Sequence, residues 1–293
     1  MTPMPTFTRR GLLAMAAALA APSLSRAAAS PRVATLDWAL LETLLALGAD
    51  VVAGTELVGF RKIAVEPAVP ESVADLGLRG TPNFEVLRFA RPDLIFNSNF
   101  YGWADGPMSR IAPVKSQSIY RMGDSPFQRA QDVTLAIADE LGLASGKRYA
   151  DDLSARLDRY RTVLSVGDGR TILPINLGDA RHYRVFGSDS MFGEVLARTG
   201  LKNAWEGKTS YTAMAPIGIE TLASMPDAWI VFIPPHPPDA LVALQNGAFW
   251  QALPAVREKR VLTIGSINPY GALPAASRFA DLLAKGLTDA WNG

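Results

Sequence analysis

The sequence predicts an α/β protein built from two lobes that a single long helix joins. In both halves of the chain, short runs rich in β-branched residues alternate with runs whose apolar residues have helical spacing. Between the halves lies one helical run, residues 146–164, of about 19 residues or roughly 28 Å. Such alternation is typical of mostly parallel sheets covered by helices, and the middle helix separates two of them.

The first elements follow one another closely. Residues 32–36 predict a strand, residues 40–47 a helix that Gly48 ends, and residues 51–53 a second strand. Glycine is the residue that most readily adopts the left-handed conformation found after a helix. Strand, helix and strand at this spacing indicate a βαβ unit.

A second unit of the same kind follows. Thr81 and Pro82 have the residue types of an N-cap and a first helical position, and the helix that they predict runs to Ala90. Residues 94–96 are apolar and predict the next buried strand. The first lobe is therefore expected to hold a parallel sheet.

Four segments are expected along the whole chain. They are a signal peptide (1–29), an N-terminal α/β lobe (30–143), a connecting helix (144–166) and a C-terminal α/β lobe (167–293). Strand and helix patterns resume at residues 171–175 and continue to residues 261–264.

The N-terminal segment predicts export. Arg9 and Arg10 directly precede an apolar run at residues 12–19, and a small-residue stretch ends it near Ala29. This is the pattern of a cleaved signal, and the arginine pair indicates the twin-arginine route. The apolar run is well short of the roughly 20 residues that span a bilayer. We therefore expect the mature protein in the periplasm.

Composition limits the partners. The signal contains Arg9, Arg10 and Arg26 and no acid, so the mature chain has 29 − 3 = 26 basic and 28 acidic residues, a net charge of −2. This balance does not favour nucleic acid or an anionic membrane. The chain has no cysteine, so it lacks both disulfides and the residue that would anchor a lipoprotein. We expect a soluble monomer.

Arg79 is the first candidate for ligand binding. It lies between Gly77 and Gly80, in a turn that leads from a strand into a helix. In parallel sheets such turns lie at the carboxyl ends of strands, where ligands bind. An arginine there offers several fixed donors to ligand oxygens. The alternative is a surface arginine paired with a carboxylate.

Aromatic residues recur in the loops after other predicted strands. Tyr101 and Trp103 follow the strand at residues 94–96, and Tyr270 follows the strand at residues 261–264. Trp205 and Tyr211 form a further aromatic loop in the second half. Aromatic side chains in polar loops have no core to fill, so we expect them to line a cleft between the lobes.

Motifs for catalysis and cofactors are missing. The chain contains no G-x-S-x-G, no G-x-G-x-x-G and no P-loop sequence. Its two histidines, His182 and His236, lie in turn and proline-rich contexts that favour a structural role. We therefore expect neither an enzyme nor a bound cofactor or metal site.

Four segments carry a resemblance to a known family. Residues 32–48, 75–83, 110–113 and 203–207 resemble the periplasmic ferric-hydroxamate-binding proteins of ABC importers, within the cluster that binds iron-siderophores, haem and vitamin B12. The resemblance spans nearly the whole chain. It implies a class III periplasmic binding protein, with two α/β lobes, one connecting helix and a shallow cleft.

The resemblance also implies roles for particular residues. Arg79 and Tyr101 match the donors to the hydroxamate oxygens, Trp205 and Tyr270 match aromatic cleft positions, and Tyr211 matches a family aromatic. Trp103 is expected to replace aromatic surface that the family has elsewhere. The cleft is expected to be more open and polar, because other residues replace family tryptophans: Ile63, Asn97, Thr212 and Asn268.

The partners follow from the same resemblance. The ligand is expected to be a ferric hydroxamate siderophore that already chelates its iron, and the receiving complex an ABC permease with its ATPase. Glu220 and Asp105 match, or lie nearest to, the acidic residues that dock each lobe on the permease.

Two alternatives remain open. A binding protein of the same class could take a catecholate or carboxylate siderophore, haem or a corrinoid. An exported enzyme that processes a siderophore is the alternative from another class, although the chain shows no acid–base or nucleophile pattern for it.

Overall fold

The computed structural model describes residues 30–207, 209 and 216–292. Residues 31–293 form one compact unit, which contains two five-stranded sheets.

The first sheet is entirely parallel, as the βαβ pattern predicts. Its order is β3(Ala74–Asp75), β2(Asp50–Gly54), β1(Arg32–Thr35), β4(Leu94–Asn97) and β5(Val114–Ser116). The helices that follow its strands are α2(Trp38–Leu47), α3(Leu57–Ile63), α4(Phe84–Ala90), η1(Asn99–Ala104) and α5(Asp105–Ser109). All four residues of β4 are buried, as expected for a strand covered on both faces.

Two predicted helix boundaries in this lobe have different outcomes. Gly48 ends α2 in the left-handed conformation with φ of 76°, which confirms the prediction. The N-cap of α4 is Asn83, so the prediction of Thr81 was wrong. Asn83 accepts hydrogen bonds from the backbone N–H groups of Glu85 and Val86, and a capping residue needs a side-chain oxygen at that position.

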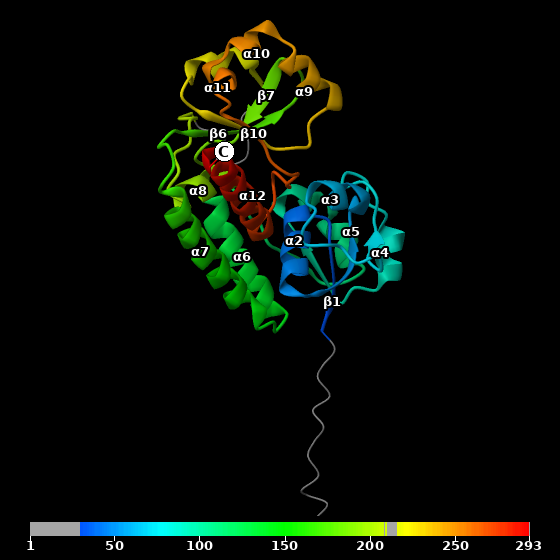
Figure 1. Cartoon of the computed structure of the whole chain (residues 1–293). Coiled ribbons are helices and arrows are strands. Elements are labelled where there is room, and N and C mark those ends of the chain that lie inside the picture. Colours follow the sequence, from blue (N-terminus) through cyan, green and yellow to red (C-terminus); the bar gives the residue numbers. More distant parts are fainter. Residues whose placement is uncertain (1–29, 208, 210–215, 293) are drawn as a thin grey trace, which may run out of the picture. The chain divides into compact units, whose positions relative to one another are not determined.

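A group of helices accompanies the predicted connecting helix (Figure 1). The helical run forms α7(Ser145–Leu164), which packs against both α6(Pro126–Glu140) and α12(Leu273–Asn292). A Cβ atom on Gly146 would lie 2.3 Å from the Cβ of Ala138, so α6 and α7 approach closely there. The expected connecting helix therefore corresponds to α7, which lies within a group of packed helices. Helix α8(Met191–Arg198) also packs against both α7 and α12.

The second sheet is mixed rather than parallel. Its order is β10(Val261–Thr263), β9(Trp229–Phe232), β6(Ile172–Leu177), β7(His182–Val185) and β8(Ile217–Gly218). Strands β10, β9 and β6 are parallel, whereas β7 and β8 pair antiparallel. The remaining helices of this lobe are η2(Ile219–Ser224), α9(Pro238–Gln245), α10(Ala248–Ala252) and α11(Pro254–Arg257). The short turn between β6 and β7 forces the antiparallel pairing.

One buried core runs through both lobes. It includes Val33 of the first sheet, Leu157 of α7, Phe279 of α12 and Trp229 of the second sheet. Two smaller clusters lie in the remaining parts of each lobe. The loops at the sheet edges are thus mounted on a shared, packed frame.

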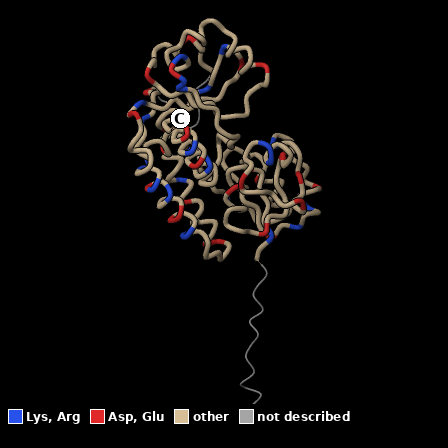
Figure 2. Tube along the Cα trace, in the orientation of Figure 1, with Lys and Arg blue, Asp and Glu red and all other residues tan. Residues whose placement is uncertain are grey.

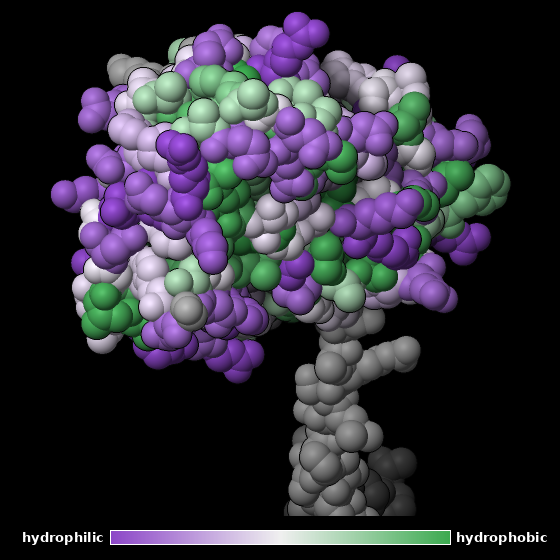
Figure 3. All heavy atoms as spheres, turned by 45° about the horizontal axis from the view of Figure 1, so that its top comes forward, coloured by the Kyte–Doolittle hydropathy of each residue, from purple (hydrophilic) through white to green (hydrophobic). Residues whose placement is uncertain are grey.

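Charges and apolar groups are distributed over the surface. Figure 2 shows basic and acidic residues interspersed along the described chain. On the side shown in Figure 3, hydrophilic residues dominate and hydrophobic ones lie in separate patches among them. Within the described residues, no helix combines the length and the apolar character needed to cross a membrane.

Candidate functional site

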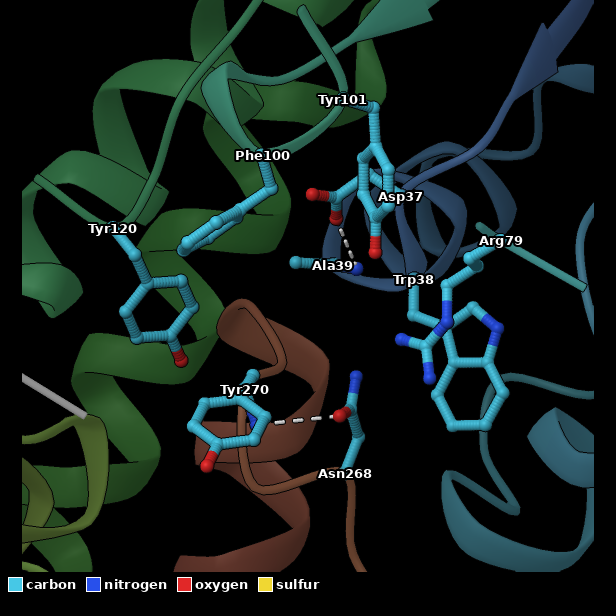
Figure 4. A pocket seen from close by; sticks show the side chains of 9 residues that line it. All are labelled: Asp37, Trp38, Ala39, Arg79, Phe100, Tyr101, Tyr120, Asn268 and Tyr270. Carbon is cyan, nitrogen blue, oxygen red and sulfur yellow. Dashed lines mark hydrogen bonds between the residues drawn. The ribbon is translucent and has the colours of Figure 1, made fainter. Parts of the chain in front are cut away.

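Two neighbouring cavities share part of their walls. The first, which we call the aromatic cavity, measures about 360 Å³. Figure 4 shows its nine lining residues: Asp37, Trp38, Ala39, Arg79, Phe100, Tyr101, Tyr120, Asn268 and Tyr270. The second, which we call the interlobe cavity, measures about 520 Å³ and shares Trp38, Arg79, Asn268 and Tyr270 with the first.

The topology of the first sheet brings most of this wall together. Asp37 and Trp38 follow β1, Arg79 follows β3, Tyr101 follows β4 and Tyr120 follows β5. These positions are the carboxyl ends of parallel strands, which meet at one edge of the sheet. The other lobe contributes Asn268 and Tyr270, from the segment between β10 and α12.

Arg79 has a fixed orientation. Its Nε donates to Oε2 of Glu56 at 2.9 Å, and its backbone N–H donates to Oε1 of the same carboxylate at 3.0 Å. The guanidinium carbon lies 4.4 Å from the centre of the Trp38 ring, a cation–π distance. Arg79 thus pairs with a carboxylate, as the alternative from the sequence states, and it also lines the cavity, where a ligand could reach its guanidinium.

Trp38 is itself held on both sides. Its indole N–H donates to the backbone oxygen of Thr55 at 2.9 Å, and its ring meets Phe60 edge-on, with ring centres 5.4 Å apart. Gly59 lies close to the indole, since a Cβ atom there would be 3.4 Å from it. These contacts fix the ring of Trp38, against which the guanidinium of Arg79 packs.

Tyr101 points its hydroxyl into the aromatic cavity, near Asp37 and Arg79 (Figure 4). Burial raises the pKa of Tyr101, and the charge of Asp37 adds to this, while the charge of Arg79 and a hydrogen bond with it act in the opposite direction. A phenol with a raised pKa stays protonated near neutral pH. Tyr101 is therefore available as a hydrogen-bond donor.

Asn97 fixes the loop that carries Tyr101 through a side-chain hydrogen bond. Its side-chain nitrogen donates to the backbone oxygen of Tyr101 at 2.9 Å and to Oδ1 of Asp105 at 2.6 Å. Asn97 is completely buried at the end of β4. The expectation that Asn97 makes the cleft more polar was therefore wrong, because its amide faces the protein and is absent from both cavity walls.

Asp37 is a buried carboxylate in the cavity wall. Its Oδ1 caps α2 by accepting from the N–H groups of Ala39 at 2.7 Å and Leu40 at 3.2 Å. Its Oδ2 accepts from the hydroxyl of Ser98 at 2.6 Å. Burial raises the pKa of Asp37, although these hydrogen bonds oppose the shift. Sequence reasoning did not identify Asp37 or Trp38 as site residues, although both follow a predicted strand.

A second buried carboxylate fixes the segment that carries Tyr270. Glu42 of α2 accepts from Nδ2 of Asn268 at 2.8 Å and from the backbone N–H of Ala272 at 3.0 Å. Burial raises the pKa of Glu42 to about 8. Gly271 leaves room for this contact, because a Cβ atom there would lie 2.5 Å from the carboxylate.

Tyr120 holds the same segment from the other side. Its hydroxyl donates to the backbone oxygen of Gly271 at 2.7 Å, and its ring meets that of Tyr270 edge-on at 6.3 Å between centres. Asn268 was expected as a polar residue of the cleft, and it lines both cavities. Its amide nitrogen donates a hydrogen bond to Glu42. Tyr270 is 42% exposed and faces the aromatic cavity (Figure 4).

The other predicted ligand residues lie in different surroundings. Trp103 is 54% exposed in η1, and Trp205 packs against the core of the second sheet with its indole nitrogen buried. Neither belongs to the described walls of the two cavities, whereas Ile63 lines the interlobe cavity. Tyr211 and Thr212 lie outside the described residues.

The predicted docking acids differ in exposure. Glu220 is exposed in the first turn of η2, in the C-terminal lobe. Asp105 is partly buried at the start of α5 and accepts a hydrogen bond from Asn97. Neither of the two histidines lines the cavities, and His182 contacts Asp179 at 3.0 Å instead.

The fold and the cavities together define a binding protein. Two sheets of parallel or mixed strands, covered by helices, form the fold of a class III periplasmic binding protein. The chain belongs to the periplasmic binding protein family, whose model matches residues 33–267. Members of this family bind substrates outside the cytoplasm and are not enzymes.

Individual relatives agree with this assignment. The chain is 32% identical to the iron(3+)-hydroxamate-binding protein FhuD of Escherichia coli (strain K12) over 294 residues, which covers 97% of each chain. Its fold matches that of FhuD from Vibrio cholerae, bound to Fe3+–Desferal, with a TM-score of 0.82 and 23% identity over 88% of this chain and 98% of that one. FhuD2 from Staphylococcus aureus, with bound ferrioxamine B, gives a TM-score of 0.70 and 17% identity over 89% and 99%.

Proposed function

We propose that this protein binds a ferric hydroxamate siderophore in the aromatic cavity and delivers it to an ABC permease with its ATPase. One observation carries the proposal. Arg79 and Tyr101, two donors of hydrogen bonds, meet in a cavity walled by Trp38, Phe100 and Tyr270. The 32% identity to a hydroxamate-binding protein over nearly the whole chain supports the same ligand class.

The chemistry of the ligand suits this wall. A hydroxamate siderophore supplies the oxygen ligands of Fe(III) itself, so the protein needs no ligands for the metal. What it needs are donors for the hydroxamate oxygens and apolar surface for the body of the chelator. Arg79 offers its guanidinium and Tyr101 its phenol, while the aromatic rings provide the surface.

Further residues of the proposed site come from the family resemblance. Arg79 and Tyr101 are assigned as donors, and Tyr270 is assigned to the aromatic wall of the cavity. Trp205, Tyr211 and Trp103 are proposed as ligand contacts on the resemblance alone, outside the described walls of the two cavities. Glu220 and Asp105 are assigned to docking on the permease. Because exposed ion pairs contribute about 0–1 kcal/mol each, such acids would set the orientation of the complex more than its affinity.

The place of action is part of the proposal. We propose that the arginine-pair signal at residues 1–29 directs export by the twin-arginine route and that the mature protein acts in the periplasm as a monomer, without a cofactor. Iron would enter the site already chelated.

Fluorescence titration tests the ligand. Ferrichrome and ferrioxamine B are added to micromolar protein, and quenching of tryptophan is followed, since Trp38 lies in the wall of the cavity. We expect saturable quenching with a ferric hydroxamate, and a smaller signal change in Trp38→Phe.

The same titration with a catecholate chelate, a carboxylate chelate, haem and a corrinoid identifies the competing ligand classes. Saturation by one of these and by no ferric hydroxamate would refute the proposal. Iron-free desferrioxamine B serves as the control for quenching that does not depend on the chelate.

A further inference from the structure

The interlobe cavity has a charged residue that the proposed site does not use. Arg184 lies in β7 and contributes to the C-terminal wall of this cavity. Alternate residues of β7 are buried: Tyr183 and Val185 face the core, while Arg184 is exposed on the opposite face. Arg184 therefore points away from the core of its own lobe.

The neighbours of Arg184 leave its charge unpaired. In the pairing of β6 with β7, Arg184 lies directly opposite Asn176, which also lines the interlobe cavity. The amide nitrogen of Asn176 donates to the backbone oxygens of Ile233 and Pro235 at 2.8 and 2.7 Å. Among the described residues, Arg184 has no side-chain hydrogen bond and no ion pair.

The neighbouring side chain on the same face of β7 has its own partner. His182 lies two residues before Arg184 and contacts Asp179 at 3.0 Å. Across the cavity, Arg79 is paired with Glu56 at 2.9 Å. The charged residues in the described wall of the interlobe cavity are therefore Arg79, Arg184 and Glu56, with a sum of 2 − 1 = +1. That excess charge belongs to Arg184.

We propose that Arg184 is a specificity residue that selects ferric hydroxamates with an anionic group outside the iron centre, such as a free carboxylate. The inference rests on the proposed function. The iron centre would lie at Arg79 and Tyr101 in the aromatic cavity, and the anionic substituent would extend into the interlobe cavity, which shares four lining residues with the first. An arginine fork matches the two oxygens of a carboxylate.

Three ligands with the same iron centre test this inference. Ferrioxamine B has an ammonium tail, its N-acetyl derivative a neutral tail and its N-succinyl derivative a carboxylate tail, so their net charges differ while their chelates are identical. Their dissociation constants are measured with the wild type, with Arg184→Gln and with Arg181→Gln. Arg181 is exposed in the turn before β7 and lines neither cavity, so its variant controls for net charge.

We expect the wild type to bind the succinyl derivative most tightly. Arg184→Gln should weaken that complex by about fivefold, the upper range for a solvent-accessible ion pair. Its effect on the acetyl derivative and all effects of Arg181→Gln should stay within about twofold. Added salt should reduce the preference of the wild type, because it screens accessible charges.

Two results would overturn the inference. One is a wild type that binds the acetyl and succinyl derivatives with equal affinity, and the other is an equal loss of both in Arg184→Gln. A wild type that binds none of the three chelates and no ferrichrome would instead refute the proposed function, so the two failures can be told apart.

Discussion

At the scale of single residues, Arg79 is the side chain whose geometry most directly suggests a ligand contact. Glu56 holds its Nε and its backbone N–H, and Trp38 lies beneath its plane. These contacts restrict the side chain before a ligand arrives. A donor that is already ordered loses less conformational entropy on binding.

Arg79→Ala should weaken the binding of a ferric hydroxamate by about 1.5–3 kcal/mol, the range for hydrogen bonds to charged groups. This corresponds to roughly a 10- to 150-fold increase in the dissociation constant. Arg79→Lys should recover only part of the loss, since lysine keeps the charge but lacks the planar fork. Fluorescence titration measures all three proteins.

Arg88→Ala is the matched control, because Arg88 is exposed on α4 and lines neither cavity. An Arg79→Ala protein that stays folded and binds as tightly as the Arg88→Ala control would remove Arg79 from the proposed donors.

Asp37 shows how far residue-level reasoning extends. Asp37 is the N-cap of α2, a common role for an aspartate directly before a helix, and that role depends only on its position in the sequence. Its place beside Tyr101 and Arg79 depends on strands β3 and β4, which lie on either side of the β1–β2 pair. No local pattern contains that neighbourhood.

At the scale of elements, α2 connects the two lobes at the site. Its N-terminus bears Asp37 and Trp38 in the cavity wall, and Glu42 on the same helix holds the segment that carries Asn268 and Tyr270. A change at Glu42 should therefore be felt in the position of Tyr270, although Glu42 itself lines neither cavity.

The buried carboxylate of Glu42 should make stability depend on pH. Its pKa in the folded protein is about 8, compared with 4.5 for the ordinary group, so between these values the folded state binds more protons than the unfolded state. Stability from this group is then fully present below about pH 4.5 and is lost as the pH rises through about 8. The raised pKa of Asp37 acts in the same direction.

The free energy of unfolding should therefore fall between pH 5 and pH 8, with up to about 1.4 kcal/mol per pH unit from one such proton. Glu42→Gln should remove this part of the slope. Urea unfolding at several pH values measures it, with the exposed Glu71→Gln as the control. Identical slopes in the wild type and Glu42→Gln would show that Glu42 does not titrate as its burial indicates.

At the scale of the whole molecule, the shared core explains why the cavity has well-defined walls. The same buried cluster includes residues of the first sheet, the helices α7 and α12, and the second sheet. The loops at the cavity extend from this frame, so their positions follow from the packing of both lobes.

Export of the whole protein should depend on the arginine pair near its N-terminus. Changing Arg9 and Arg10 together to lysine should retain the precursor in the cytoplasm, because the twin-arginine route depends on that pair. Arg26→Lys, in the same segment but outside the pair, should leave export unchanged. Cell fractionation and the size of the protein on a gel measure both. Mature protein in the periplasm of the double variant would exclude this route.

The sequence by itself determined the local structure and the class of fold. Periodicity and glycine indicated α2, α7 and several of the strands, because these signals depend on neighbours within a few residues. It also indicated Arg79, Tyr101 and Tyr270, since each follows a predicted strand. The Arg79 and Trp205 segments were specific enough to indicate the family.

Only the tertiary structure decided which of these residues share a wall. Asn97 turned inward, Trp103 and Trp205 lay outside the two described cavity walls, and Asp37, Trp38 and Tyr120 entered one. The contact of Glu42 with Asn268 joins residues 226 positions apart, and Arg184 opposes Asn176 through strand pairing. Such neighbours are set by sheet order and core packing, which no short stretch of sequence encodes.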